Sequence, residues 1–428
     1  MKKQNQFFFV HLSPFAIFVP DMKTPAILLL TALGCLAAPG AALAQRATLA
    51  VSNPSDAQRQ EIVEIPARDV YARLGLRPGQ SFTVRNASGQ EVDYQLTHDS
   101  LLLLDVSVRP GGTAIFRLQP GTPRAATPAV EGRRYPERLD DVAWENDRTA
   151  YRVYGPALQR TGERSFGIDV WVKNTPELVV ADRYALELGH QARIRQLQAE
   201  GKRAEAAELQ RQTSYHYDHG NGLDCYQVGP TLGCGAPALL EGDSLLLPYC
   251  YRTCEILDNG PLRFAVRLDY GPFDAGTDRG VTEHRIIRCD KGSNFCRLTV
   301  WYDGLTAPRT LAAGVVVHTA DTTSLACGEG YVAYADPTDN PARHNFQIYT
   351  GLLFPDAGVR TCPRLYAKPA GSVAGHAVGL VTYRPGQRFT YYFGSAWSKA
   401  DVRTFAEWRQ RAAGTLAALR QPLQVAFR

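Results

Sequence analysis

A short segment of the chain, residues 215–226, holds its densest group of reactive side chains. The sequence YHYDHGNGLDCY contains two histidines, two aspartates, three tyrosines and two glycines in twelve residues. Histidine exchanges protons near neutral pH and tyrosine can protonate a leaving oxygen, while the glycines indicate a loop, because they allow backbone conformations that strands and helices avoid. We therefore predict an acid–base site whose catalytic residues are His216, His219 and Tyr217 and whose substrate-binding residues include Tyr215, Asp218 and Asp224.

Two other interpretations of this loop stay open. The oxygens of Asp218, Asn221 and Asp224 are hard ligands that suit a structural calcium ion. Alternatively, the histidines and aspartates bond one another and only shape the loop. His216 and His219 have no second pair of ligands at zinc spacing, so we expect no catalytic metal and no cofactor other than that calcium ion.

A second cluster, with the sequence WENDR, combines an aromatic ring with paired carboxylates. Residues two apart on a strand point the same way, so Glu145 and Asp147 could flank one pocket as the catalytic carboxylates of a glycoside hydrolase. Trp144 would then support a sugar ring and Arg148 would bind substrate. The alternative is a salt-bridged strand in which the carboxylates pair with Arg148 and Arg152.

Aromatic and basic residues elsewhere indicate further sugar contacts. His284 and Arg285 lie on one predicted strand, Trp301 on a neighbouring one, and Trp397 near the end of the chain. Aromatic faces stack on sugars, and a guanidinium binds the planar carboxylate of a uronic acid through two hydrogen bonds. The sequence after residue 44 has no phosphate-binding glycine loop, HExxH motif or GxSxG motif, which removes the main support for kinase, dinucleotide-dependent, zincin and lipase functions.

The composition of the 428 residues is that of an ordinary globular protein. With 45% hydrophobic and 21% charged residues, the chain is not a disordered polymer, a collagen or a multi-span membrane protein. Its net charge of +5 is too small to indicate nucleic-acid binding. Residues 22–44 show a lysine, an apolar stretch and the sequence ALA before Gln45, the pattern of a secretory signal peptide preceded by an over-extended start. We expect export to the periplasm or beyond, without a membrane span.

The remaining chain is predicted to be mainly β. Glycine, proline, phenylalanine and tyrosine number 37, 27, 17 and 20, against two methionines, which favours turns between aromatic-rich strands. Short β-type segments within residues 46–119 predict a small β-sandwich, followed by a linker at 120–134. Period-two alternation predicts a large antiparallel β domain over 135–428, with a helical insertion at 178–212 that breaks near Gly201.

Eight cysteines follow the signal segment, and an even number in an exported protein favours disulfide bonds. We predict sequential pairs because each pair flanks a turn-rich loop. These pairs are Cys225–Cys234, Cys250–Cys254, Cys289–Cys296 and Cys327–Cys362.

Five segments resemble the bacterial secreted family catalogued as domain of unknown function 4861. They are WENDRTAYRVYGPAL at 144–158, GIDVWVKNTPE at 167–177, YHYDHGNGLDCYQVGPTLGCG at 215–235, NGPLRFAVRLDYGP at 259–272 and YYFGSAW at 391–397. The resemblance spans residues 140–420 and implies a role beside polysaccharide-degrading enzymes, often unsaturated rhamnogalacturonyl hydrolases. The large domain also resembles the galactose mutarotase-like supersandwich, which implies a broad two-sheet fold whose concave face holds sugars. Because one fold hosts several chemistries, the reaction has to be inferred from the site.

We therefore expect an exported enzyme that cleaves uronate-containing, pectin-type oligosaccharides by β-elimination. The expected roles are base for His216 or His219, acid for Tyr217 or Tyr215, and carboxylate binding for Arg148 or Arg285. Hydrolysis by a carboxylate pair, non-catalytic carbohydrate binding, and mutarotation or epimerisation are the alternatives. The expected partner is an oligosaccharide or polysaccharide, and the sequence leaves the oligomeric state open.

Overall fold

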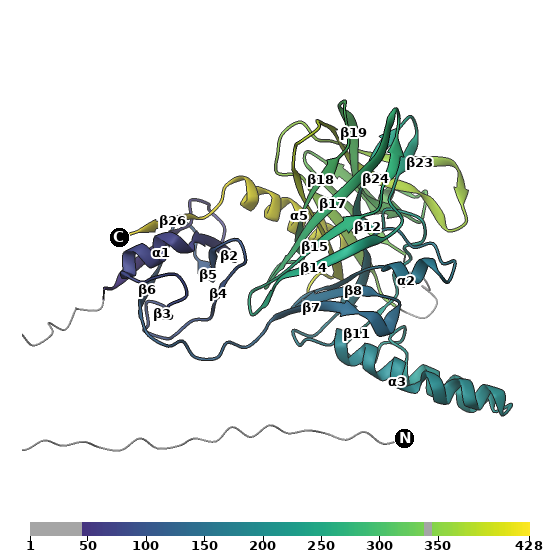
Figure 1. Ribbon diagram of the computed structural model, residues 1–428, viewed down its shortest axis with the longest axis horizontal. Coiled ribbons are helices and arrows are strands. Elements are labelled where there is room, and N and C mark those ends of the chain that lie inside the picture. The colour runs from purple at the N-terminus through teal and green to yellow at the C-terminus, as the bar shows by residue number, and fades with distance from the viewer. Residues whose placement is uncertain (1–44, 338–344) are drawn as a thin grey trace, which may run out of the picture. The chain divides into compact units, whose positions relative to one another are not determined.

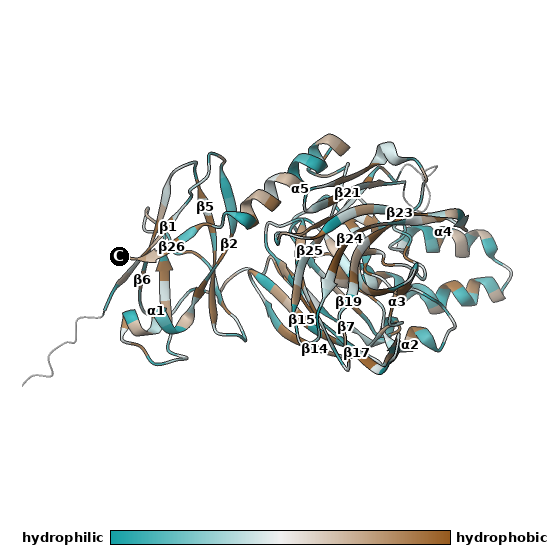
Figure 2. Ribbon diagram, turned by 90° about the horizontal axis from the view of Figure 1, so that it is seen from above, coloured by the Kyte–Doolittle hydropathy of each residue, from teal (hydrophilic) through white to brown (hydrophobic). Residues whose placement is uncertain are grey.

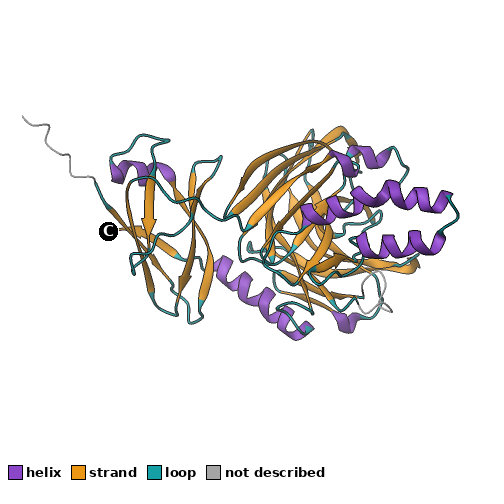
Figure 3. Ribbon diagram, turned by 90° about the horizontal axis from the view of Figure 1, so that it is seen from below, coloured by secondary structure: helices purple, strands orange, loops and turns teal. Residues whose placement is uncertain are grey.

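The computed structural model describes residues 45–337 and 345–428, and the predicted signal segment at residues 1–44 lies outside them. The described residues form antiparallel sheets with few helices, which confirms the predicted mainly β class (Figure 3). None of the helices described combines the length and the apolar character needed to cross a membrane. The galactose mutarotase-like arrangement stays a prediction.

The N-terminal part is a small sandwich of two antiparallel sheets. One has the order β26-β1-β6-β3 and the other the order β2-β5-β4. Their inner faces and helix α1 enclose a hydrophobic core that includes the fully buried Leu49, Phe82 and Leu104. The elements are β1 (Ala47–Ser52), β2 (Arg59–Pro66), α1 (Ala67–Leu74), β3 (Phe82–Arg85), β4 (Tyr94–Leu96), β5 (Leu101–Val108), β6 (Thr113–Pro120) and β26 (Gln424–Phe427).

The last strand of the chain belongs to this small sandwich. β26 pairs with β1 so that Phe427 lies opposite Leu49 and Val425 opposite Val51, and Figure 2 shows the two strands side by side. This differs from the expectation that residues 135–428 form one domain. A strand of four residues carries too little periodicity to indicate from the sequence which sheet it joins.

The large part contains two sheets that share one core. The smaller has the order β13-β12-β19-β24-β23, and the larger has the order β14-β15-β17-β18-β25-β22-β21-β20 with β16 paired to β17. The alternation predicted on β15 is confirmed, because Phe264, Val266, Leu268 and Tyr270 are buried in this core. Figure 2 shows hydrophobic residues along the core strands β19 and β24. The strands are β12 (Cys234–Glu241), β13 (Ser244–Leu246), β14 (Tyr251–Gly260), β15 (Arg263–Tyr270), β16 (Phe273–Ala275), β17 (Asp278–Asp290), β18 (Phe295–Asp303), β19 (Arg309–Val317), β20 (Leu325–Gly328), β21 (Tyr331–Asp336), β22 (Ile348–Leu353), β23 (Arg360–Ala370), β24 (Val373–Tyr383) and β25 (Phe389–Trp397).

A third sheet, with the order β11-β10-β9-β8-β7, positions the candidate site. On β8, Val142 and Trp144 face the large core, whereas Ala143 packs in a second cluster with residues of helix α3. Pairing carries this alternation across the sheet, because Arg152 on β9 lies opposite both Ala143 and Asp169. The face toward α3 therefore carries charged side chains. The elements are β7 (Val130–Tyr135), β8 (Asp141–Asn146), β9 (Ala150–Val153), β10 (Asp169–Lys173), α3 (Val180–Ala199) and β11 (Gly222–Asp224).

Helices α3 and α4 lie in the predicted insertion, and Figure 1 shows α3 extending away from the sheets. The chain turns between them at Gly201, whose φ of 76° is a conformation that glycine adopts without strain. At the other end of the chain, Thr404 caps α5 by accepting a hydrogen bond from the N–H of Glu407 at 3.2 Å. The remaining helices are α2 (Pro156–Gln159), α4 (Arg203–Thr213) and α5 (Phe405–Arg420), with 3₁₀ turns η1 (Pro136–Arg138) and η2 (Thr322–Ser324).

The predicted disulfide bonds are absent from the described residues. Cys289 on β17 and Cys296 on β18 hydrogen-bond to each other, and burial is the main cause that raises the pKa of Cys289. Burial, together with the nearby Cys362, raises the pKa of Cys327 to about 11. In two of the four predicted pairs, the two cysteines therefore lie near each other, but as free thiols without a disulfide bond.

Candidate functional site

The loop between α4 and β11 is shaped by Asp218 and two glycines. Asp218 Oδ1 accepts hydrogen bonds from the N–H groups of Gly220 at 2.9 Å and Gly222 at 3.0 Å. The φ angles of these glycines are 96° and 108°. A Cβ on Gly222 would lie 1.9 Å from the carbonyl oxygen of Val172, so only glycine lets the loop close onto β10.

Five of the predicted residues line one pocket of about 370 Å³. A pocket of this volume lies in the range of small-molecule sites. The predicted residues are His216, Tyr217, Asp218, His219 and Trp397, and the pocket is completed by Arg211, Leu223, Asn345 and Phe346. The structure thus brings together the acid–base residues of the loop and one predicted aromatic residue.

Each histidine of the pocket has one ring nitrogen beside a backbone carbonyl. His216 Nδ1 lies 3.0 Å from the carbonyl oxygen of Asp224, and His219 Nε2 lies 2.9 Å from that of Ser214. Because a carbonyl oxygen only accepts, these two nitrogens carry protons, and the opposite nitrogen of each neutral ring holds a lone pair. His216 Nε2 and His219 Nδ1 are therefore the nitrogens that can accept a proton, and the His216 side chain is 48% exposed.

Asp218 is the carboxylate of the pocket, and it forms an ion pair with Lys399. Burial opposes its ionisation, but hydrogen bonds from Lys399 and from the N–H groups of Gly222 and Gly220 outweigh burial and lower the pKa of Asp218. Asp218 therefore stays ionised at neutral pH, where it holds the lysine beside the pocket and shapes the loop.

Two aromatic residues form a wall of the pocket. Trp397 is buried, and its Nε1 donates to the carbonyl oxygen of Asn345 at 2.8 Å. Phe346 is 54% exposed and stands edge-on to Trp397, with ring centroids 5.9 Å apart at 86°. Its φ of 61° is uncommon for a bulky residue, and such conformations cluster at functional sites. The exposed phenyl ring suits stacking on the apolar face of a sugar.

Glu145 does not reach the pocket, and it does not form the predicted carboxylate pair with Asp147. Glu145 is buried, where it accepts a hydrogen bond from Lys173 Nζ at 2.5 Å and from two N–H groups at the start of α3 at 2.8 and 2.7 Å. Asp147 accepts a hydrogen bond from the turn between β17 and β18 at 2.6 Å. The expected alternation fails because β8 ends at Asn146, one residue before Asp147.

Four predicted substrate-binding residues are buried away from the pocket. Trp144 is in the core, where its ring stacks on Phe264 at 6.1 Å. Arg285 is fully buried and pairs with a neighbouring glutamate at 2.5 Å. Tyr215 and Asp224 are also buried, beneath the loop that carries His216. Trp144 belongs to the core between the large sheets and Tyr215 to the cluster between the third sheet and α3, and none of these four side chains lines the pocket.

Three more predicted residues lie elsewhere on the surface. Arg148 forms an ion pair with Asp401. The ring of His284 hydrogen-bonds to two aspartates at 2.6 and 3.1 Å. Trp301 is stacked on His284 at 5.0 Å, and the guanidinium of Arg388 lies 4.3 Å from its centroid, so this indole already has partners where a sugar would stack.

The contacts of the loop oxygens do not favour calcium. Asp218 pairs with a lysine, Asn221 Oδ1 accepts from Arg183 at 2.5 Å, and Asp224 Oδ2 accepts from Arg152 at 2.8 Å. Each predicted ligand therefore faces a cationic side chain, which would repel a calcium ion.

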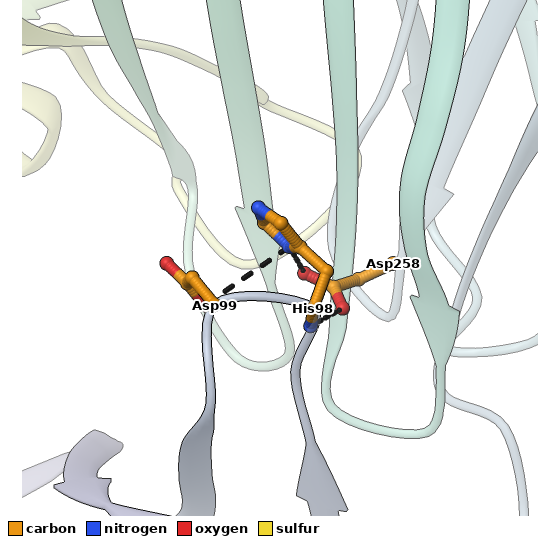
Figure 4. A group of neighbouring side chains, drawn as sticks. All are labelled: His98, Asp99 and Asp258. Atoms are coloured by element: carbon orange, nitrogen blue, oxygen red, sulfur yellow. Dashed lines mark hydrogen bonds and ion pairs between the residues drawn. The ribbon is translucent and has the colours of Figure 1, made fainter.

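His98, Asp99 and Asp258 form a separate cluster whose ligand-type atoms lie within 4.8 Å of one another (Figure 4). His98 Nδ1 lies 2.7 Å from an oxygen of Asp258. Asp99 accepts hydrogen bonds from the Thr97 hydroxyl at 2.6 Å and from Arg288 at 3.0 Å. Because a guanidinium already neutralises Asp99, we interpret this cluster as an ionic contact between the β4–β5 turn and β14.

Besides the apolar Leu223, four residues in or beside the pocket were not predicted from the sequence, namely Arg211, Asn345, Phe346 and Lys399. They come from the end of α4, the segment before β22 and the turn after β25. Arg211 directly precedes the loop but lies on a helix with many charged residues, and only the tertiary fold brings the other three to the loop, so no local pattern marks these residues. The motif YYFGSAW ends two residues before Lys399 and was the nearest signal.

Comparison with known proteins places the chain among uncharacterised relatives. It is 25% identical over 403 residues to "Uncharacterized protein P7" of Formosa agariphila, a match covering 89% of this chain and 93% of that protein. Among solved structures, it is similar to an alpha-mannosidase from Enterococcus faecalis V583, with 10% identity, a TM-score of 0.43, and coverage of 90% of this chain and 46% of that one. It is also similar to the periplasmic domain of Thermotoga maritima YidC, with 11% identity, a TM-score of 0.31, and coverage of 68% and 97%.

The chain spans about half the length of the mannosidase structure that it matches. The domain of unknown function DUF4861 matches residues 51–425, so it includes the small N-terminal sandwich as well as residues 140–420, where the resemblance was found. The chain belongs to the DUF4861 family.

Proposed function

We propose that the chain is an exported carbohydrate-active enzyme that cleaves uronate-containing oligosaccharides by β-elimination in the pocket around His216. The observation that carries this function is the pair of imidazoles, each with one nitrogen held by a backbone carbonyl and the other left with a lone pair. Tyr217 and the exposed ring of Phe346 line the same pocket. These groups supply a base, an acid and a surface for a sugar ring.

In a β-elimination, the base removes the proton from C5 of the uronate, beside the carboxylate. The electrons of the C5–H bond form a C4=C5 double bond, the C4–O bond breaks, and the acid protonates the departing oxygen. We assign the base to His216 Nε2 and the acid to Tyr217. The imidazolium and the phenolate left after each turnover return to their starting states by proton exchange with water.

The substrate carboxylate needs a cation, because negative charge moves onto it as the C5 proton leaves. Arg148 and Arg285 lie away from the pocket, whereas Arg211 lines it. Arg211 bonds to the exposed Glu208 at 2.6 Å and lies near enough to Tyr217 to interact with it electrostatically. We therefore propose that Arg211 binds the substrate carboxylate.

Hydrolysis by a carboxylate pair has less support. Glycosidases of that kind need two carboxyl groups across the scissile bond, and Asp218 is the one carboxylate among the described residues that line the pocket. Its ion pair with Lys399 also keeps it ionised, so it is a poor proton donor. Non-catalytic sugar binding would use the same two aromatic residues. The experiment below distinguishes it from catalysis.

The test is to incubate the purified chain with oligogalacturonates and to follow the ultraviolet absorbance of the conjugated double bond. We expect His216→Ala to lower the rate by about a hundredfold or more. The matched control is His190→Ala, because His190 is a partly exposed histidine on α3 whose Nδ1 also lies beside a backbone carbonyl, at 2.8 Å, but outside the pocket. This control should react at the wild-type rate.

Each other outcome contradicts a defined part of the function. Cleavage without a new chromophore would replace elimination by hydrolysis. Saturable binding without cleavage, weakened in Phe346→Ala, would make the chain a carbohydrate-binding protein. Equal rates for His216→Ala and His190→Ala would show that the reaction does not depend on His216.

A further inference from the structure

His216 rests on a buried charged group that the reaction above does not use. Asp224, the last residue of β11, contacts the imidazole twice. Its carbonyl oxygen lies 3.0 Å from His216 Nδ1, and its carboxylate Oδ2 lies 3.8 Å from the same nitrogen. Asp224 is buried, so little water competes for these contacts.

Arg152 holds Asp224 from the interior. Its Nη2 donates to Asp224 Oδ2 at 2.8 Å and its Nε donates to Asp169 Oδ2 at 2.8 Å. Its Nη1 lies 3.8 Å from Asp141 Oδ2. One buried guanidinium on β9 thus ties together carboxylates from β8, β10 and β11, and this fixes the end of β11 on which the histidine rests.

The cluster has more acidic than basic groups. Its three carboxylates face Arg152 and one further arginine, Arg138, whose Nη1 lies 3.9 Å from Asp141. Burial raises the pKa of Asp169 to about 7, with Asp224 adding to the increase and Arg152 opposing it. Burial also raises the pKa of Asp141. Whether or not these two carboxyls are protonated, the Asp224 carboxylate lies 3.8 Å from His216 Nδ1, where its charge favours a positive charge on the ring.

We propose that Asp224, fixed by Arg152, is the positioning residue of His216. Its carbonyl selects the ring tautomer that carries the proton on Nδ1, and its carboxylate stabilises the ring after Nε2 has taken a proton. The expected effect on turnover rests on the function proposed above. The expected tautomer of the His216 ring in the free protein does not depend on that function.

The other titratable groups around His216 are already partnered or neutral at their contact. The ring of Tyr215 lies 4.6 Å from the imidazole centroid. On the pocket side, the groups are Arg211, which bonds Glu208, Asp218, which pairs with Lys399, and the side chains of Tyr217 and His219. Asp224 is therefore the acidic residue that is placed to set both the orientation and the charge of the ring.

The test reads the ring directly, by two-dimensional ¹⁵N NMR of the histidines of the full chain, with His216 assigned by its loss in His216→Gln. We expect the neutral wild-type ring to show a protonated Nδ1 and an unprotonated Nε2. Asp224→Asn keeps the backbone carbonyl and the side-chain volume but breaks the ion pair with Arg152. Because the end of β11 is then no longer fixed by Arg152, we expect the carbonyl to move away from Nδ1 and the ring to shift toward the other tautomer. We expect kcat to fall by about tenfold or more with little change in KM.

Asp141→Asn is the matched control, because it removes a carboxylate from the same cluster without touching the histidine loop. A wild-type ring with its proton on Nε2, or a folded Asp224→Asn variant with an unchanged His216 spectrum, would overturn the assignment. If Asp224→Asn fails to fold, Arg152→Lys retains the charge but cannot bridge the carboxylates. An unchanged ring in folded Arg152→Lys overturns the assignment equally. If no substrate is turned over, the proposed function fails while the NMR result still decides the role of Asp224.

Discussion

Substituting Glu145 separates a structural carboxylate from a catalytic one. Both of its oxygens accept hydrogen bonds, one from Lys173 Nζ at 2.5 Å and the other from two N–H groups at the start of α3 at 2.8 and 2.7 Å. Both side chains of the ion pair are almost completely buried. We therefore expect Glu145→Gln to destabilise the fold and to leave the chemistry of each folded molecule intact.

The size of the loss follows from these contacts. Breaking one partner of a buried ion pair costs roughly 3–5 kcal/mol. Glutamine can still accept from the N–H groups, but its amide turns a donor toward the ammonium of Lys173, which keeps only the carbonyl oxygen of Asn146 at 2.7 Å. Burial already lowers the pKa of Lys173, so this lysine can lose its proton and limit the loss. We expect the low end of the range, about 3 kcal/mol.

The measurement is urea unfolding of wild type, Glu145→Gln, and the double variant Glu145→Gln with Lys173→Met. The double variant should lose less stability than the single one, because no unpaired ammonium stays buried. Turnover or sugar binding is measured in the same samples and divided by the folded fraction. A stable Glu145→Gln protein that has lost turnover would refute the structural role and restore Glu145 as a catalytic carboxylate.

Three further predictions test the loop and the small sandwich. Because the pKa of Asp218 is lowered in the folded protein, its contribution to stability is complete above the unfolded value and lost as the pH falls through the folded value. The unfolding free energies of wild type and Asp218→Asn should therefore differ by about 1 kcal/mol at pH 7 and converge as the pH falls through the folded value, which lies below 3.8. A gap that widens in acid would contradict this. Gly222→Ala should lower the unfolding free energy by about 3 kcal/mol or more, because the added Cβ would lie 1.9 Å from a backbone carbonyl oxygen. Gly220→Ala has open space around the added Cβ and should lower the unfolding free energy by only about 1 kcal/mol in the same denaturation assay. Deleting residues 421–428 removes β26 and should speed amide hydrogen exchange in β1 but not in β24. If the deletion leaves exchange in β1 as slow as in the wild type, β26 does not stabilise β1.

Local patterns predicted the elements of this fold better than their partners. The alternation of Phe264, Val266, Leu268 and Tyr270 was visible because side chains on a half-buried strand repeat every second residue. The break between α3 and α4 was visible because Gly201 has no Cβ to oppose a positive φ. The strand β26 could not be assigned to the small sandwich, because its pairing with β1 joins the two ends of the described chain.

The same limit applies to the candidate site. His216, Tyr217 and His219 could be found because they are close in sequence and unusual in composition. Arg211 could not, although it lies just before the loop, because nothing distinguishes it from the other charged residues of its helix. Phe346 could not, because a distant part of the chain brings it to the loop. Such partners become predictable only once the packing of the sheets is known.

The misassignment of Glu145 shows what distinguishes a reactive residue from a structural one. Spacing shows which residue types are present but not whether their polar atoms are already satisfied. In the folded chain, both oxygens of Glu145 accept hydrogen bonds from protein groups and the side chain is buried, so a substrate cannot reach it. His216 differs, because a backbone carbonyl occupies Nδ1 while the ring stays 48% exposed beside the pocket. A functional assignment therefore depends on whether buried contacts orient a side chain and still leave its reactive atom accessible. The loop of His216 meets that condition. The buried pair of Glu145 and Lys173 does not.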